Sequence, residues 1–205
     1  MLAVPWARLA AAGLLLVVLM DLVRRWPLFL WPLEGIAVGL LAAAAAWCLD
    51  EPAGAVVDAA PRPLWWRTVA RSVGIAGLLG VWTVAVWSAR HSLLDHPWDV
   101  WIQGLTGGAV GMAWATWRRS TGVRTPGIAF AAGLVPVVAL WALVRPFGAT
   151  VPVFPYVGGD WATSTTGWVG VGLAASVCIA LVLSDSRWWR VGVRPAPARE
   201  RRAPA

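Results

Sequence analysis

Residues 50–72, with the sequence DEPAGAVVDAAPRPLWWRTVARS, are the longest polar interruption between two strongly apolar segments. The apolar segments on either side cover 28–49 and 73–88. Towards the end of the interruption, Trp65 and Trp66 stand among arginines. This composition is typical of a short helix that lies on a membrane surface, with its apolar side chains inserted and its arginines among the lipid headgroups. The stretch therefore predicts a membrane protein with a polar connection between two spans.

The composition of the whole chain excludes a water-soluble domain. Of its 205 residues, 59% are hydrophobic and only 13% are charged, and the mean hydropathy is +0.67. A soluble fold could not remove that much apolar surface from water. The net charge of +7 comes from arginines that separate apolar segments, where membrane topology explains them, so no nucleic-acid partner is expected. Both cysteines, Cys48 and Cys178, lie inside apolar segments, so neither a disulfide framework nor a cysteine metal site is predicted.

The apolar segments predict an all-α fold, a polytopic helical bundle with about six transmembrane helices. The expected spans cover 9–23, 28–49, 73–88, 100–117, 126–144 and 167–183. They make 1–186 a transmembrane domain, with an inner loop at 50–72, an outer re-entrant or interfacial element at 145–166, and a disordered tail at 187–205. The element at 145–166 contains prolines, glycines and aromatic residues and is too apolar for a free loop, although an ordered lid without a function explains it equally well.

The distribution of arginines predicts the orientation. Thirteen of the 17 arginines fall on the side of the two termini, and four, at positions 24, 25, 90 and 145, fall on the other side. Because positive residues accumulate on the inner side of membrane proteins, both termini are expected inside, in a multi-pass protein of the cell inner membrane. The pair Arg24 and Arg25 is the exception to this rule.

Glycines at helical spacing predict close packing between spans. Gly35 and Gly39 share one face of the second span, where a neighbouring helix can approach closely. The fourth span carries two interleaved pairs of small residues and is expected to be the most tightly packed helix; its glycines are Gly104, Gly107, Gly108 and Gly111. Pro136, near the middle of the fifth span, predicts a kink.

Glu34 is the acid that lies most clearly inside a predicted span. An ionisable group at that depth needs a cavity, a partner or a proton, so Glu34 is a candidate for a transport pathway. The alternative is an interfacial glutamate near the outer headgroups, held by Arg24 or Arg25.

The only cluster of potential metal ligands consists of two histidines and two aspartates at 91–99. His91 and Asp95 would share a helical face, but the pattern is weak, and solvated loop residues explain it better, with Asp95 or Asp99 capping the next helix. No metal site, cofactor or catalytic residue is assigned. A membrane enzyme that uses this cluster is the least supported function, because no nucleophile stands beside a plausible base.

The stretch DEPAGAVVDAAPRPLWWRTVAR at 50–71 resembles the corresponding part of small six-helix actinobacterial membrane proteins that are described as membrane subunits of ATP-binding cassette transporters. The arrangement of an inner loop after the second helix and an outer element before the sixth is similar to exporter-type permeases of that superfamily. In those permeases the inner loop docks on a separate ATPase. The resemblance implies a docking role for five residues, Asp50, Glu51, Asp58, Arg62 and Arg67.

The expected function is therefore a permease subunit of an ATP-binding cassette transporter, driven by a separately encoded ATPase. The chain contains no lysine and no GxxxxGK[ST] motif, so it cannot hydrolyse ATP at a P-loop of its own and is not expected to be an enzyme. The expected partners are membrane lipid, a soluble ATPase and a second membrane subunit, in a homodimer or a heterodimer. The alternative is an accessory or assembly subunit that does not transport and whose helices pack against another membrane complex.

Overall fold

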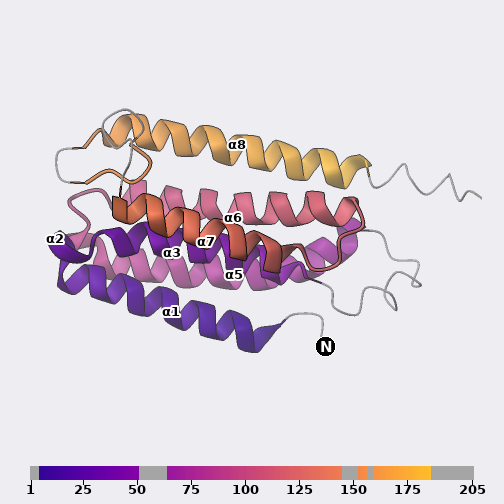
Figure 1. The fold of residues 1–205 in the computed structure, drawn as a ribbon, viewed down its shortest axis with the longest axis horizontal. Coiled ribbons are helices and arrows are strands. Elements are labelled where there is room, and N and C mark those ends of the chain that lie inside the picture. The colour runs from indigo at the N-terminus through magenta and orange to yellow at the C-terminus, as the bar shows by residue number, and fades with distance from the viewer. Residues whose placement is uncertain (1–4, 51–63, 145–151, 157–158, 186–205) are drawn as a thin grey trace, which may run out of the picture.

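The computed structural model describes residues 5–50, 64–144, 152–156 and 159–185. In this part of the chain the fold is all-α (Figure 1). The seven α-helices are α1 (Trp6–Arg25), α2 (Pro27–Leu30), α3 (Pro32–Cys48), α5 (Leu64–Ala89), α6 (Pro97–Ser120), α7 (Pro126–Val144) and α8 (Trp161–Asp185), and a 3-10 turn, η1, covers Arg90–Ser92.

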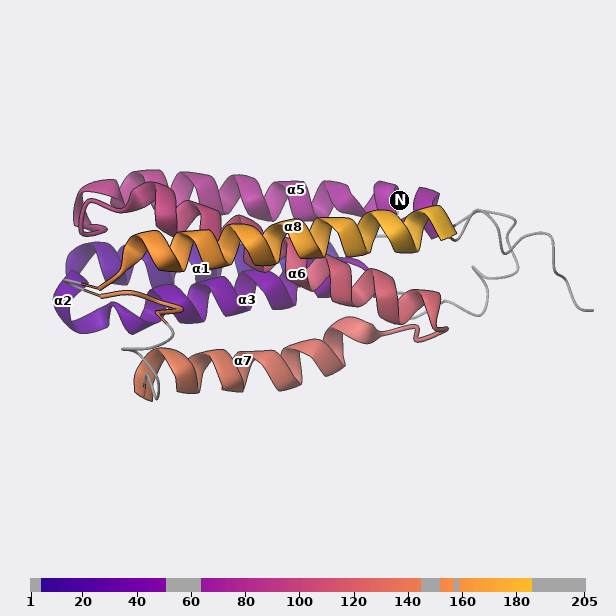
Figure 2. The same cartoon turned by 90° about the horizontal axis from the view of Figure 1, so that it is seen from above.

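The six long helices run along one common axis and alternate in direction (Figure 1). One end of the bundle holds the first residues of α1 and the last residues of α8, and we call it the terminal end; the other we call the distal end. Figure 2 shows α5 and α7 on opposite sides, while α1 and α8 lie on opposite sides in Figure 1. Helix α3 packs against α1, α5, α6 and α7, and α8 packs mainly against α6. Helices α3 and α6 therefore form the centre of the bundle.

Four helices are long and apolar enough to cross a membrane: α1, α5 together with η1, α7 and α8. Helix α3 is apolar but has only 17 residues, which is about 25 Å of helix against a hydrocarbon core of about 30 Å. Helix α6 has 24 residues but includes polar and charged side chains, and it is not among the four. The described residues therefore form a helical bundle with the composition of a multi-pass membrane protein.

Small side chains allow α3 to occupy the centre. Five consecutive alanines at 42–46 are all buried, and glycines on α3 and α6 bring backbones together. On α6, a Cβ on Gly107 would lie 3.0 Å from Val38, and one on Gly111 would lie 2.0 Å from the carbonyl oxygen of Ala42. The backbones of α3 and α6 therefore touch at a distance that any larger side chain would prevent.

The second pair of α6 glycines faces another helix. A Cβ on Gly104 would lie 2.0 Å from Nε1 of Trp82, and one on Gly108 would lie 3.1 Å from Leu79, both on α5. The two interleaved pairs of small residues thus pack against two different helices. Residues 107 and 111 face α3, and residues 104 and 108 face α5.

Gly35 and Gly39 of α3 face α7. A Cβ on Gly35 would lie 3.1 Å from Ala142 and from Phe154, and one on Gly39 would lie 3.0 Å from Val138. Helix α7 runs without interruption from Pro126 to Val144 and includes Pro136.

The structure differs from the expected boundaries in three places, one of which is the start of α8 at Trp161, within the outer element expected at 145–166. Helix α5 begins at Leu64, so residues 64–72 continue the helix of the third span instead of forming a separate surface helix. The sequence contains no proline between Leu64 and Ala89, so no proline breaks the helix between residues 64–72 and the apolar segment that follows. The second span is divided at Trp31, because α2 ends at Leu30 and α3 begins at Pro32. The predicted tail, 187–205, lies outside the described residues.

Candidate functional site

A polar node at the terminal end joins three helices at the point where the chain leaves α3. The Oδ1 atom of Asp50 accepts a hydrogen bond of 2.7 Å from the backbone N–H of Gly127, at the start of α7. From α5, Arg71 donates to the carbonyl oxygens of Cys48, at 3.4 Å, and of Asp50. We define the polar node as Asp50, Arg71 and Gly127. It fixes the end of α3 to the beginnings of α5 and α7.

Both charged members of the polar node are buried. Asp50 is 5% exposed and Arg71 is 8% exposed. Burial raises the pKa of the Asp50 carboxyl group, since an ionised carboxylate loses hydration there. The hydrogen bond from Gly127 and the positive charges of Arg8, Arg71 and Arg119 act in the opposite direction and stabilise the ionised form. The two ionisable side chains of the polar node therefore lie inside the protein and not on its surface.

The five predicted docking residues divide into two groups. Glu51, Asp58 and Arg62 lie outside the described residues. Arg67 lies near the start of α5 and is partly buried, and Asp50 belongs to the polar node. Asp50 thus positions the beginning of the connecting segment and is buried, and docking by the five residues stays a prediction.

A second buried polar pair lies between α3 and α6 towards the distal end. Glu34 is 1% exposed and Gln103 is 0% exposed. The contacts from Gly107 to Val38 and from Gly111 to Ala42 show that the two helices run parallel in this register. Gln103 stands one turn before Gly107 and Glu34 stands one turn before Val38, so the pair is level on facing sides of the two helices.

These positions bear on the two explanations offered for Glu34. The arginines that were expected to hold it bind another acid: Arg24 and Arg25 each donate to Asp21 at 2.7 Å, on their own helix. Arg24 and Arg25 therefore do not hold Glu34, which is enclosed by the bundle. A role of Glu34 in a pathway stays a prediction.

The segment 152–156 packs onto the break between α2 and α3 at the distal end of the bundle. The indole of Trp31 is 1% exposed and donates a hydrogen bond of 2.8 Å to the carbonyl of Pro155. The hydroxyl of Tyr156 donates to the carbonyl of Leu28 at 2.6 Å, and Phe154 lies against Gly35. Part of the element expected at 145–166 is thus an ordered cover of α2 and α3. Residues 145–151 and 157–158 of that element lie outside the described residues, and residues 161–166 belong to α8.

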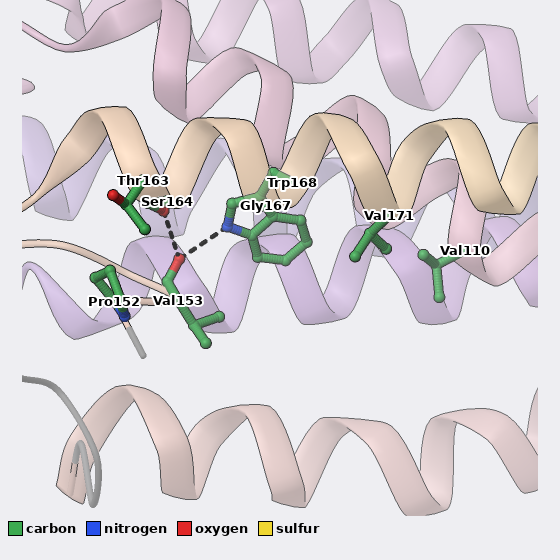
Figure 3. Close-up of a pocket in the computed structure, with 8 residues that line it drawn as sticks. All are labelled: Val110, Pro152, Val153, Thr163, Ser164, Gly167, Trp168 and Val171. Carbon is green, nitrogen blue, oxygen red and sulfur yellow. Dashed lines mark hydrogen bonds between the residues drawn. The ribbon is translucent and has the colours of Figure 1, made fainter. Parts of the chain in front are cut away.

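An apolar groove of about 480 Å³ lies beside this cover, between α6, α8 and residues 152–153 (Figure 3). The carbonyl of Val153 accepts hydrogen bonds from Ser164, at 3.2 Å, and from the indole of Trp168, at 2.8 Å. Val110 and Val171 line it at the end away from Pro152 and Val153. The lining of the groove is mostly apolar, and its hydroxyl groups already have partners, Ser164 in Val153 and Thr163 in Asp160.

The histidines and aspartates at 91–99 do not assemble into a metal site. In the described part of the chain, no three His, Cys, Asp or Glu residues are placed to hold a metal ion. Nδ1 of His96 lies 2.9 Å from Asp99, whose other oxygen accepts a hydrogen bond from Thr165 of α8, and the His96 ring stacks on Trp161 at 4.2 Å. His96 is the residue before α6, and no side chain caps that helix, so capping by Asp95 or Asp99 is wrong. His96 and Asp99 instead link α6 to α8, while His91 accepts a hydrogen bond from Arg90.

Among the buried polar residues that the sequence missed are Arg71, Gln103 and Arg119. Hydropathy counts them as ordinary polar positions near span ends, and their burial depends on which neighbour each helix face meets. For Gln103 a signal was available, because it stands four residues before Gly107 on the same packing face.

Comparisons of the chain with protein-family models, with curated proteins and with solved structures found no match.

Proposed function

We propose that this chain is the membrane-embedded permease subunit of an exporter-type ATP-binding cassette transporter, driven by a separately encoded ATPase. In this proposal it crosses the inner membrane six times, with α2 and α3 together as the second span and α6 as the fourth, and both termini are cytoplasmic. The excess of arginine at the terminal end supports this orientation.

The observation that carries the proposal is the polar node. A partner that binds the segment between α3 and α5 would act directly on Asp50 and Arg71. Through Gly127 the same movement would reach α7. Because α3 packs against four other helices, a small shift at its end would be transmitted through the centre of the bundle. This is the mechanical requirement for coupling ATP hydrolysis in one subunit to a conformational change in another.

The distal end supports the proposal in a second way. The cover formed by 152–156 lies directly over the break between α2 and α3, close to Gly35. In this proposal, the polar node and the segment 152–156 are the two places at which the bundle would change its packing during transport. Glu34, enclosed below this cover, would meet a pathway only when α3 and α6 separate.

The test is purification of the tagged full chain from its native membrane in a mild detergent, followed by identification of the proteins bound in constant ratio. We expect a soluble protein with a P-loop and ATPase activity. The double variant Asp58→Arg, Arg67→Glu should lose this ATPase, whereas Arg124→Glu, in the α6–α7 turn at the same end, should keep it. Unchanged recovery of the ATPase with the double variant would contradict docking at this segment.

A variant of the polar node separates docking from coupling. In Arg71→Met, the connecting segment keeps its own side chains but loses the link to α5. We expect the ATPase to bind as before, while ATP-driven transport by the reconstituted complex falls. If transport and binding stay as in the unmodified protein, the node is not the coupling element.

The second candidate is an accessory subunit that does not transport, and one observation favours it. Only 11% of the residues in the most apolar part of α7 and 6% of those in α8 are buried, so each helix packs on one side, against α3 and α6 respectively, and exposes the rest of its surface. Another membrane subunit could cover these surfaces. Transport by vesicles that contain only this chain and its ATPase would exclude this candidate.

A further inference from the structure

A cationic side chain lies on exposed aromatic rings at the terminal end of α6. The Cζ atom of Arg118 is 5.9 Å from the ring centre of Trp114 and 5.7 Å from that of Trp117. The two indoles meet edge to face at 5.3 Å, and Trp114 also contacts Phe130 of α7 at 5.7 Å. We call Trp114, Trp117 and Phe130 the aromatic shelf. It crosses from α6 to α7 and carries Arg118.

The guanidinium of Arg118 makes no hydrogen bond or ion pair with any residue in the described ranges, and the two ring contacts are its interactions there. Five N–H donors in a planar fork remain for a ligand. Planar guanidinium groups bind phosphate through two parallel hydrogen bonds, and the rings beneath hold the group in place at little entropic cost.

The surroundings favour an anion. The sequence from Val100 to Val144 contains no aspartate or glutamate, and it contains three arginines, Arg118, Arg119 and Arg124. Arg119 is buried at 9% exposure, whereas Arg124 is exposed in the turn between α6 and α7. An anion at Arg118 would therefore meet positive charge from this stretch, while the Asp50 carboxylate that bonds to Gly127 of α7 is buried.

The shelf also has the character of a surface that contacts lipid. Trp114 is 37% exposed and Trp117 is 43% exposed, and Ile128 of α7, at 54%, continues the apolar surface beside them. Tryptophans with an apolar body and a polar N–H collect at the boundary between hydrocarbon and headgroups. A soluble anion would use only the guanidinium, whereas a phospholipid would use the guanidinium and the rings.

We propose that Arg118 and the aromatic shelf bind one anionic phospholipid, with the phosphate on Arg118 and the upper part of an acyl chain against Trp114 and Phe130. The lipid would join the end of α6 to the start of α7. The site is independent of the function proposed above, since it uses neither the polar node nor the connecting segment.

Native mass spectrometry of the detergent-solubilised full chain tests the proposal. Phosphatidylglycerol and phosphatidylcholine with the same acyl chains are titrated into the unmodified protein, Arg118→Gln and Arg124→Gln. The second variant is the matched control, because it removes the same charge from the same end but away from the shelf. We expect Arg118→Gln to weaken the tightest phosphatidylglycerol binding by about five-fold, which corresponds to about 1 kcal/mol per arginine near a membrane surface. The control should change it by less than half of that.

Equal weakening in the two arginine variants would overturn the proposal, because general charge would then explain the binding. Equal loss of phosphatidylcholine and phosphatidylglycerol binding in Arg118→Gln would also overturn it, as would displacement of the lipid by millimolar inorganic phosphate.

A second variant, Trp114→Leu, keeps Arg118 and tests the aromatic shelf. It should weaken the binding of phosphatidylglycerol with long acyl chains more than the binding of phosphatidylglycerol with short ones. Thermal unfolding of each variant in detergent checks that its fold is intact. Arg118→Lys, if its unfolding temperature is unchanged, should bind phosphatidylglycerol with an affinity between those of the unmodified protein and Arg118→Gln.

Discussion

The carbonyl oxygen of Ala42 occupies the space in which a Cβ of Gly111 would stand, at 2.0 Å from that position. The contact joins the backbones of α3 and α6 at the centre of the bundle. Gly107 makes a similar approach to Val38 one turn away, so the α3–α6 register depends on glycine at both positions.

Gly111→Ala is therefore expected to destabilise the protein by about 1–3 kcal/mol, because the added methyl group meets backbone that cannot rotate away. Gly77→Ala on α5 is the matched control, since a Cβ there meets nothing within 4 Å. Alanine at that position should leave stability unchanged or raise it by up to about 1 kcal/mol, as it does in an ordinary helix. Thermal unfolding in detergent measures both. Equal midpoints for the two variants would show that α3 and α6 do not pack in this way.

The cover over the distal end gives a second prediction. Trp31→Phe removes the hydrogen bond to the carbonyl of Pro155 and leaves that buried acceptor without its donor. We expect a loss of about 1–3 kcal/mol and easier cleavage by protease near 145–160. Trp26→Phe is the control, since Trp26 is 51% exposed. The two variants would respond alike to protease and heat if 152–156 were not held by Trp31.

Much of the packing could be predicted from the sequence, because small residues at helical spacing mark faces that meet other helices. Gly35, Gly39 and the four glycines of α6 show this. The end of a helix is a different problem, since hydropathy locates the apolar part of a span and says little about where the backbone hydrogen bonds stop. For this reason the start of α5 at Leu64 was missed.

The environment of polar side chains could not be predicted, because it depends on contacts between distant parts of the chain. Trp31 and Pro155 are 124 residues apart, and Asp50 and Gly127 are 77 apart. Nothing in the local sequence of Asp50 distinguishes a buried carboxylate that holds α7 from an exposed one that docks a partner. The rotation of each helix about its axis and the choice of its neighbours decide this.

The polar node predicts a dependence of stability on pH. Burial raises the pKa of Asp50 above its ordinary value of 3.8, so the folded protein binds a proton more tightly at this site than the unfolded protein does. Stability is then expected to fall as the pH rises from about 4 through the raised pKa, and to stay level above it. In Asp50→Asn the amide oxygen can still accept from Gly127, and this dependence should disappear. Thermal midpoints across that pH range measure the effect, and parallel curves for the two proteins would exclude Asp50 as its source.

The link between α6 and α8 gives the last prediction. Thr165 donates to Asp99, which also contacts His96, and these bonds tie the first turns of the two helices together at the distal end. A double-mutant cycle with Asp99→Asn and Thr165→Val should show a coupling energy of about 1–2 kcal/mol, since the hydrogen bond involves a charged acceptor. The matched cycle pairs Asp99→Asn with Thr166→Val, whose hydroxyl bonds to the carbonyl of Ala162 on its own helix. That cycle should give a coupling near zero. If the two cycles give the same coupling energy, Asp99 does not join α6 to α8 through Thr165. Helix α8 is then held by the contact of Gly172 with Thr106 and by the other packing along α6.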